Sequence, residues 1–192
     1  MARTPSTMLP LGTPAPAFRL PDFTGRVHTL ENFREQPALL IAFICNHCPF
    51  VRHIRTGFAS YARDFRPQGL AVVAINSNDV NAYPQDGRDA MRAEAADAGY
   101  EFPYLLDETQ AVAKAYRAAC TPDFYLFDAG RRLVYRGQFD DSRPGNGRPV
   151  TGADLRAATA AVLAGRTPDA QQAPSIGCNI KWKPGNAPDY AA

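Results

Sequence analysis

The chain has 192 residues, which is enough for one globular domain with short extensions at its ends. Its formal net charge is only +2 and its basic residues form no long run, so neither nucleic acid nor an anionic membrane surface is an expected partner. It has no run of about 18 apolar residues and no apolar signal core near its start, so we expect a cytoplasmic protein without a membrane span.

The N-terminal quarter combines a proline-rich leader with the first strands. Residues 1–16 hold four prolines and are expected to form an extended leader. Phe18 and Leu20 alternate with other residues, which predicts a β-hairpin over 17–30. The apolar run 39–44 has the length and continuity of a strand that is buried on both faces.

Helices and strands alternate through the middle of the chain. Apolar residues at helical spacing predict a helix over 50–65, which Pro67 and Gly69 end. The segments that follow are predicted to be a strand at 70–75, a loop at 76–79, a helix at 84–98, a strand at 102–106 and a helix at 107–118.

The C-terminal third begins with a hairpin and ends in a tail. Thr151 is a plausible N-cap and Gly165 a stop for a helix over 151–164. Residues 166–192 show little periodicity and are expected to form an extended tail. Ahead of this helix the sequence predicts a strand at 124–127, a turn at 128–130, an antiparallel strand at 133–137 and a polar loop at 141–149.

This order of elements predicts the fold class. Strands that are separated by helices imply parallel neighbours in one sheet, and the last hairpin adds an antiparallel strand. We therefore expect an α/β protein with a three-layer sandwich, an N-terminal β-hairpin extension and an extended C-terminal tail. One domain would span residues 17–165, between the leader 1–16 and the tail 166–192.

Cys45 and Cys48 stand where the strand 39–44 ends and a helix begins. The free N–H groups and the dipole at a helix start stabilise a thiolate, and a protonated His47 within the motif would lower the thiol pKa further. The spacing lets the second sulfur reach the first, so a mixed disulfide can be resolved within the chain. We predict a redox-active dithiol in which Cys45, the residue nearer solvent, is the nucleophile and Cys48 resolves.

A metal site is the alternative reading of the same residues. Cys45, Cys48 and a histidine could bind zinc or copper, but structural zinc usually brings a second close pair of cysteines. Cys120 and Cys178 instead stand alone in the sequence. The redox interpretation is therefore preferred, and it requires no bound cofactor and no metal.

Two motifs carry a resemblance to a known family. Cys-Asn-His-Cys at 45–48, after a buried strand, and Thr121-Pro122, before the hairpin, resemble the thioredoxin superfamily. The resemblance implies a thioredoxin-like fold and a cis peptide bond before Pro122, packed against the dithiol. Residues 15–22 and 76–79 resemble its redoxin (AhpC/TSA-like) branch, and residues 177–186 resemble the uncharacterised peroxiredoxin-like bacterial group.

The sequence also departs from the peroxiredoxin pattern Pro-x-x-x-Thr/Ser-x-x-Cys. Cys48 is the cysteine in register, Ile41 and Cys45 occupy the proline and threonine positions, and Pro122 falls where the peroxiredoxin arginine stands. The groups that activate peroxide are therefore missing, which favours disulfide exchange. A peroxiredoxin-like thiol peroxidase with antioxidant activity is the alternative, with a sulfenic acid at either cysteine resolved by its neighbour or by Cys178.

The other candidate residues support the dithiol or extend it. His47, Thr121 and Pro122 are expected to tune it. Cys120 and Cys178 are possible redox relays, although Cys120 is more simply explained as a small buried residue. Cys178 could equally be a distal resolving cysteine, a disulfide partner or an exposed thiol.

Residues outside the motifs carry weaker signals, and the partners follow from the redox interpretation. Asn76, Ser77 and Asp79 end a parallel strand, where sites gather, but they also suit a hydrogen-bonded turn. His28 is expected on the surface. The expected partners are a protein or small-molecule disulfide, or a peroxide, and an external thiol reductant. The sequence leaves the oligomeric state open, a homodimer included.

Overall fold

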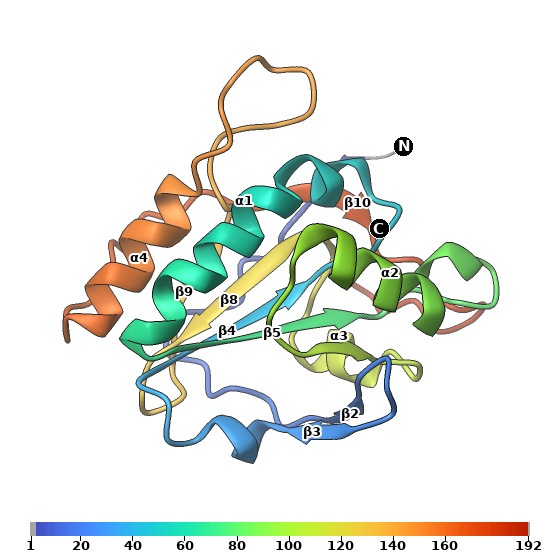
Figure 1. The fold of residues 1–192 in the computed structure, drawn as a ribbon, viewed down its shortest axis with the longest axis horizontal. Coiled ribbons are helices and arrows are strands. Elements are labelled where there is room, and N and C mark those ends of the chain that lie inside the picture. Colours follow the sequence, from blue (N-terminus) through green and yellow to red (C-terminus); the bar gives the residue numbers. More distant parts are fainter. Residues whose placement is uncertain (1–2, 192) are drawn as a thin grey trace.

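The computed structural model describes residues 3–191, and its centre is a five-stranded mixed sheet in the order β6-β5-β4-β8-β9 (Figure 1). The central strand β4 pairs in parallel with β5, which pairs in parallel with β6. On its other side β4 pairs with β8 in the antiparallel sense, as β8 does with β9. The strands are β4 (Ala38–Phe43), β5 (Leu70–Asn76), β6 (Tyr104–Leu106), β8 (Asp123–Phe127) and β9 (Leu133–Gly137).

Helices and a hairpin cover the two faces of this sheet and make three layers (Figure 1). Successive side chains of a strand point to opposite faces, so Leu40 packs with one layer and Leu39 with the other. The first layer holds α1 (Pro49–Phe65), α2 (Arg88–Ala98) and α4 (Ala153–Leu163). The second holds α3 (Ala111–Ala115) and the hairpin of β2 (Arg19–Pro21) and β3 (Val27–Thr29). The predicted three-layer α/β sandwich with an N-terminal hairpin is confirmed.

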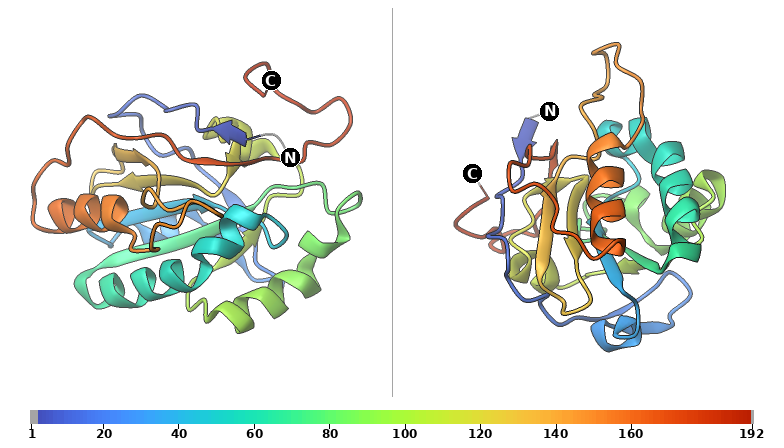
Figure 2. Two further views of the ribbon diagram at one scale, coloured as in Figure 1. Left: turned by 90° about the horizontal axis from the view of Figure 1, so that it is seen from above. Right: turned by 90° about the vertical axis from the view of Figure 1, so that its left-hand side faces the viewer.

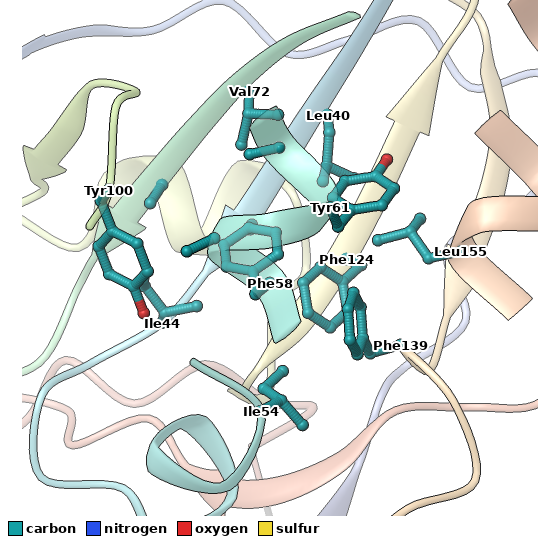
Figure 3. Close-up of a cluster of buried hydrophobic side chains, with 14 of the residues drawn as sticks. Leu40, Ile44, Ile54, Phe58, Tyr61, Val72, Tyr100, Phe124, Phe139 and Leu155 are labelled. Carbon is teal, nitrogen blue, oxygen red and sulfur yellow. The ribbon is translucent and has the colours of Figure 1, made fainter. Parts of the chain in front are cut away.

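The core under α1 is built from aromatic rings, as Figure 3 shows. Phe58 packs edge-on against Phe124 of β8 and Phe139, at ring-centroid distances of 5.4 and 6.1 Å. Such edge-to-face contacts add specificity to the burial of large apolar surfaces. This packing fixes α1 against β4 and β8, and so fixes the first turn of α1 relative to the end of β4.

A second, three-stranded sheet joins both ends of the chain, which the sequence pattern did not predict (Figure 2). β10 (Ile176–Asn179) lies between β1 (Arg3–Pro5) and β7 (Cys120–Thr121), antiparallel to both. The expected leader 1–16 and the expected tail 166–192 therefore each contribute a strand. Residues 1, 2 and 192 lie outside the described part of the chain. These strands have two to four residues, too few to show an alternating pattern.

Two helices are shorter than the sequence predicts. In place of one helix over 84–98, a 3-10 turn η3 (Pro84–Asp86) comes first and Gly87, in an extended conformation, precedes α2. The helix expected over 107–118 forms only at α3, because Gln110 has a φ of 65° and breaks the helical path before it. The first of these breaks turns the Asp86 side chain toward the sheet, where it is fully buried.

β8 runs antiparallel to β4, although a helix precedes it and a parallel strand was expected. A helix between two strands does not by itself fix their relative direction. The connection 107–122 leaves β6 and enters β8 at the same end of the sheet, since Asp123 pairs with Phe43 at the end of β4. This is also the end where Cys45 lies.

Two local expectations are also corrected. The N-cap of α4 is Gly152, with a φ of 67°, because the Asp140 carboxylate accepts the N–H groups of both Thr151 and Gly152. His28 is buried instead of exposed, and its ring is 2.9 Å from the Asp22 carboxylate. No helix within residues 3–191 has both the length and the apolar character that crossing a membrane requires.

Candidate active site

Cys45 and Cys48 lie between the end of β4 and the start of α1, as the sequence predicts. The Ile44 N–H donates to the Ile75 carbonyl, which extends the sheet as far as the first cysteine. Cys48 is the N-cap of α1, with φ −69° and ψ 122°, and Pro49 is the first helical residue. An extended residue before proline and a proline at the first helical position are both favourable, so Pro49 starts this helix without delaying it.

Thr121 touches both cysteines from the neighbouring segment. Its hydroxyl oxygen is 3.4 Å from the Cys45 sulfur, and its carbonyl oxygen accepts a hydrogen bond from the Cys48 thiol at 3.1 Å. The peptide bond between Thr121 and Pro122 is cis, as the resemblance implied. The structure thus brings together the dithiol and the Thr-Pro segment, which are more than 70 residues apart in sequence.

Cys178 reaches the same place from the C-terminal segment. In β10 it lies opposite Thr121 of β7, and its thiol and backbone N–H both hydrogen-bond to the Cys48 sulfur. Gly177 permits this approach, because a Cβ atom there would lie 1.9 Å from the Thr121 carbonyl oxygen. The three sulfurs of Cys45, Cys48 and Cys178 therefore form a hydrogen-bonded chain with Cys48 in the middle.

Cys120 is close in sequence but makes a different contact. It is fully buried in β7, and its thiol is 3.6 Å from the Pro122 carbonyl oxygen, to which it donates. Burial raises the pKa of this thiol well above its usual value. These contacts agree with the interpretation of Cys120 as a small buried residue, and its relay role stays a prediction.

His47 is held by Asp86, a residue for which the sequence pattern predicted no role. The His47 Nδ1 atom is 2.6 Å from the Asp86 Oδ2 atom, and the backbone N–H groups of Asn46 and His47 donate to Oδ1 at 2.9 and 3.3 Å. The His47 ring also stacks on Tyr83 with 5.4 Å between ring centroids. The pair Asp86-Gly87, inside an expected helix, is a sequence signal that could have revealed a helix break at this partner.

The loop 76–79 forms a hydrogen-bonded turn, which is one of the two interpretations that the sequence allowed for it. Asn78 donates to Asp86 Oδ2 at 2.8 Å, and the Asn76 side chain donates to the Asp86 carbonyl at 2.7 Å. The Asn78 side-chain oxygen accepts the Lys181 N–H at 2.8 Å, which connects the loop to the segment after β10. The loop therefore serves the site indirectly, by fixing Asp86 and the C-terminal segment.

The hydrogen bonds divide the charge unequally between the two cysteines. Donation by the Cys178 thiol, and then by the Cys45 thiol, lowers the pKa of Cys48 to about 2. The Thr121 carbonyl acts in the opposite direction, since it can accept only from a protonated thiol. Two thiol donors outweigh one carbonyl contact, so we assign the negative charge of the reduced pair to Cys48.

Cys45 is the protonated member of the pair. Its hydrogen bond to Cys48, followed by burial and the Asp86 charge, raises the pKa of Cys45 well above its usual value. The thiolate is thus assigned to the second cysteine of the motif, where the thiol donors act most strongly and the Val51 N–H of the first turn of α1 adds a smaller effect. The assignment of Cys45 as nucleophile stays a prediction, and it requires that the Cys45 proton is transferred before or during attack.

Metal-ligating atoms also gather here, but they are already engaged. One atom each from Cys45, His47 and Asp86 lie within 4.8 Å of one another. Both Asp86 oxygens accept hydrogen bonds, Oδ1 from two backbone N–H groups and Oδ2 from His47 and Asn78. A metal ion would have to displace these partners, so the donor set fits a hydrogen-bonded network better than a metal centre.

The sulfurs of Cys45, Cys48 and Cys178 are buried, and the neighbouring His47 side chain is partly exposed to solvent. The exposed fraction is 1% for Cys45, 0% for Cys48 and 1% for Cys178. Cys48 has buried residues around it, namely Cys45, Thr121 and Cys178. The His47 side chain lies beside Cys45 and is 16% exposed, so we take the His47 side as the mouth of the site.

Comparisons with known proteins agree with this geometry. The AhpC/TSA family matches residues 11–136, which is more than half of the chain. A hypothetical protein from Sinorhizobium meliloti 1021 is 59% identical, with a TM-score of 0.94 over 95% of this chain and 100% of that one. An uncharacterized conserved protein from Geobacillus kaustophilus is 54% identical, with a TM-score of 0.94 over 96% of this chain and 98% of that one.

More distant structures share the fold alone. A putative thiol:disulfide interchange protein, DsbE, from Chlorobium tepidum is 21% identical, with a TM-score of 0.61 over 81% of this chain and 99% of that one. Among curated proteins, none matches the sequence. The family match over residues 11–136 includes the dithiol and the Thr121-Pro122 segment. The chain therefore belongs to the AhpC/TSA family of redoxins and has their thioredoxin-like fold.

Proposed function

We propose that the protein is a thiol–disulfide oxidoreductase that uses Cys45 and Cys48 as its reacting dithiol. The observation that carries this proposal is the hydrogen bond between the two thiols, because the atoms that must join in an internal disulfide are already neighbours. Thr121 contacts both sulfurs and holds them beside the cis proline. Membership of a redoxin family supports redox chemistry at cysteine in general terms.

Cys45 is the better candidate for attack on an incoming disulfide. It lies within 4.8 Å of His47, whose side chain reaches solvent, whereas the hydrogen-bond partners of Cys48 are the buried residues Cys45, Thr121 and Cys178. The negatively charged Cys48 sulfur accepts the Cys45 S–H and lies next to the sulfur it has to reach, so it is placed to resolve the mixed disulfide once Cys45 has reacted. The Cys45 proton has to leave toward the His47 side of the site.

The proposed cycle is balanced within the dithiol and the substrate. Cys45 passes its proton to His47 and attacks one substrate sulfur, and the other substrate sulfur leaves as a thiolate. That thiolate takes the proton from His47, and the Cys48 thiolate then attacks the Cys45 sulfur and releases the second half of the substrate as a thiolate. The substrate has gained two electrons and the dithiol has become a disulfide. An external thiol reductant returns it to the starting state.

Asp86 and His47 would carry the proton at the mouth of the site. Because the Asp86 carboxylate engages the His47 Nδ1 atom, the Nε2 atom is left to exchange a proton with the leaving thiolate. Stacking on Tyr83 fixes the plane of the ring. His47 would therefore act on the substrate, and Asp86 would act through His47 as a positioning residue.

The test is reduction of two disulfides, insulin and a small aromatic disulfide, by the pre-reduced protein. We expect turnover with an external thiol reductant and, in a single turnover, one internal disulfide that includes Cys48 for each substrate disulfide reduced. Cys120→Ser is the matched control, because it removes a buried thiol of the same segment that donates to a carbonyl. No disulfide reduction, alongside rapid consumption of hydrogen peroxide, would replace this proposal with a peroxidase.

The same preparation separates the remaining alternative. Metal analysis of protein purified without chelator is expected to find substoichiometric zinc and copper. One tightly held ion per chain, lost in Cys45→Ser, would favour a metal-binding role through Cys45, Cys48 and a histidine.

A further inference from the structure

Cys48 has a second cysteine partner, which the exchange cycle described above does not use. Cys178 donates both its thiol and its backbone N–H to the Cys48 sulfur, which also accepts the Cys45 thiol. β10 holds it there through two independent constraints, its pairing with Thr121 and the close approach of Gly177 to the Thr121 carbonyl. A thiol held in contact with a redox-active sulfur can form a disulfide with it when one sulfur is oxidised.

We propose that Cys178 is the third redox cysteine of this site and that it moves the internal disulfide from Cys45–Cys48 to Cys48–Cys178. This inference rests on the proposed function, because the Cys45–Cys48 disulfide is its starting state. The step places the oxidised bond between α1 and β10 and returns Cys45 to the thiol form at the mouth of the site.

The exchange needs no further oxidant or reductant. The Cys178 sulfur loses its proton and attacks the Cys48 sulfur, the Cys48–Cys178 bond forms, and the Cys45–Cys48 bond breaks. Cys45 leaves as a thiolate and takes up the proton. One disulfide is present before and after the step, so the number of electrons on the protein is unchanged.

The contacts of Cys178 change with the redox state in the direction that this step requires. In the reduced protein its hydrogen bond to Cys48, followed by burial and the Cys48 charge, raises the pKa of Cys178. Once Cys48 is part of a disulfide it carries no charge, so the first and third of these causes are removed. Lys181, which lowers the pKa of Cys178, remains. Cys178 is therefore a protected thiol in the reduced state and a better nucleophile in the oxidised one.

Cys120 provides the internal comparison. It lies on β7, the strand next to β10, and it is as deeply buried as Cys178, but its thiol donates to the Pro122 carbonyl. Burial in the same sheet is thus shared by both residues, whereas contact with the Cys48 sulfur distinguishes Cys178. The proposal predicts that the two cysteines behave differently on oxidation.

The test uses Cys45→Ser, which removes the competing partner and leaves Cys48, Cys120 and Cys178. The reduced variant is treated with one equivalent of an azo oxidant that takes two electrons from a thiol pair, quenched in acid, unfolded and labelled with a maleimide. We expect the label on Cys120 alone and a peptide map with a Cys48–Cys178 disulfide within one chain. Cys45→Ser/Cys120→Ser should keep this disulfide, and Cys45→Ser/Cys178→Ser should lose it.

The wild-type protein supplies the second readout. After a single turnover with the aromatic disulfide, we expect both Cys45–Cys48 and Cys48–Cys178 bonds in the peptide map. The inference is overturned if Cys45→Ser keeps Cys48 and Cys178 labelled, or links them only between chains. If the wild type reduces the substrate and ends with Cys45–Cys48 alone, the inference fails and the proposed function stands. If the wild type reduces no disulfide, the proposed function fails first.

Cys178→Ser and Cys178→Ala separate the redox role from hydrogen bonding. Serine keeps a donor to Cys48 but forms no disulfide, whereas alanine removes both properties. We expect both variants to lose the Cys48–Cys178 bond, and only alanine to raise the pKa of the reduced dithiol, as followed by thiolate absorbance. If the wild type forms no Cys48–Cys178 bond and the alanine variant still shifts the pKa of the dithiol, then Cys178 is a hydrogen-bond donor only.

Discussion

The five-stranded sheet and the three-stranded sheet meet at the cysteines, and they are built in different ways. The first is made of buried strands that alternate with helices, and it supplies Cys45 and Cys48. The second joins three short strands from the start, the middle and the end of the chain, and it supplies Thr121 and Cys178. The central sheet carries the reacting pair, and the small sheet determines its surroundings.

This difference shows why the motif does not by itself define the site. The donors that lower the pKa of Cys48 begin with Cys178, and the carbonyl that opposes them belongs to Thr121, so both come from the small sheet. Substitutions that change one sheet at a time therefore separate effects on the chemistry from effects on stability.

Changing the central sheet's own cysteines should have the largest effect. Cys45→Ser is expected to reduce disulfide exchange to the uncatalysed rate, since no attacking sulfur remains at the mouth. Cys48→Ser is expected to trap a mixed disulfide between Cys45 and the substrate, visible by mass spectrometry under non-reducing conditions. If instead Cys45→Ser kept full activity and Cys48→Ser lost it, the roles of the two cysteines would be reversed.

Asp123 tests the junction between the two sheets through pH. It follows the cis proline, opens β8 and is fully buried, and burial raises its pKa from 3.8 to about 7. The folded state therefore holds a proton that the unfolded chain has released, so stability should be full below pH 3.8 and should fall as the pH rises toward 7. The loss is at most about 1.4 kcal/mol per pH unit.

Asp123→Asn should remove this slope. Chemical denaturation of both proteins at several pH values measures it, with Tyr125→Phe as a control for the Tyr125 hydroxyl, which donates to the Asp123 carboxylate at 2.9 Å. A wild-type stability that rises over the same pH range would contradict the assignment of a protonated Asp123.

Asp86→Asn should affect catalysis more than folding. The side-chain amide of asparagine fills the same space but can accept hydrogen bonds only at its oxygen, so the His47 ring loses a charged hydrogen bond. Such a bond is worth roughly 1.5–3 kcal/mol, or about 10- to 160-fold in rate. We expect a lower kcat and an altered pH profile in disulfide reduction. An unchanged pH profile with lower stability would show that Asp86 only supports the loop 76–79.

Gly177→Ala disturbs the small sheet alone. The new Cβ would lie 1.9 Å from the Thr121 carbonyl oxygen, so β10 must shift, at a cost of about 1–3 kcal/mol in the free energy of unfolding. Gly130→Ala is the matched control, because the nearest atom there is 3.4 Å away. We expect Gly177→Ala to change the pKa of the dithiol as well, since it moves Cys178. A variant as stable as the control would show that β10 is not held against Thr121.

The sequence was sufficient for the central sheet and for the motif, because these depend on local patterns. The apolar run 39–44 and the helical spacing over 50–65 predict β4 and α1 closely, and the family resemblance supplied the cis bond before Pro122. The direction of β8 was not predicted, since it depends on the path of the connection 107–122, which no local pattern shows.

The small sheet and the Asp86 network could not be predicted in the same way. β1 and β10 are too short for periodicity, and their pairing joins residues near opposite ends of the chain, as with Arg3 and Cys178. Asp86 looked like part of a helix because the break at Gly87 leaves the apolar pattern of α2 intact. Contacts between distant segments therefore decide the part of the site that local patterns miss.

The central claim is that Cys45 and Cys48 act together as an exchanging dithiol. The most direct measurement is a peptide map of the wild-type protein after one turnover with a small disulfide substrate, combined with a count of substrate thiols released. The account predicts two substrate thiols for each protein disulfide formed, with Cys48 in every internal disulfide. A sulfenic acid at either cysteine without substrate reduction, or a disulfide that omits Cys48, would contradict it.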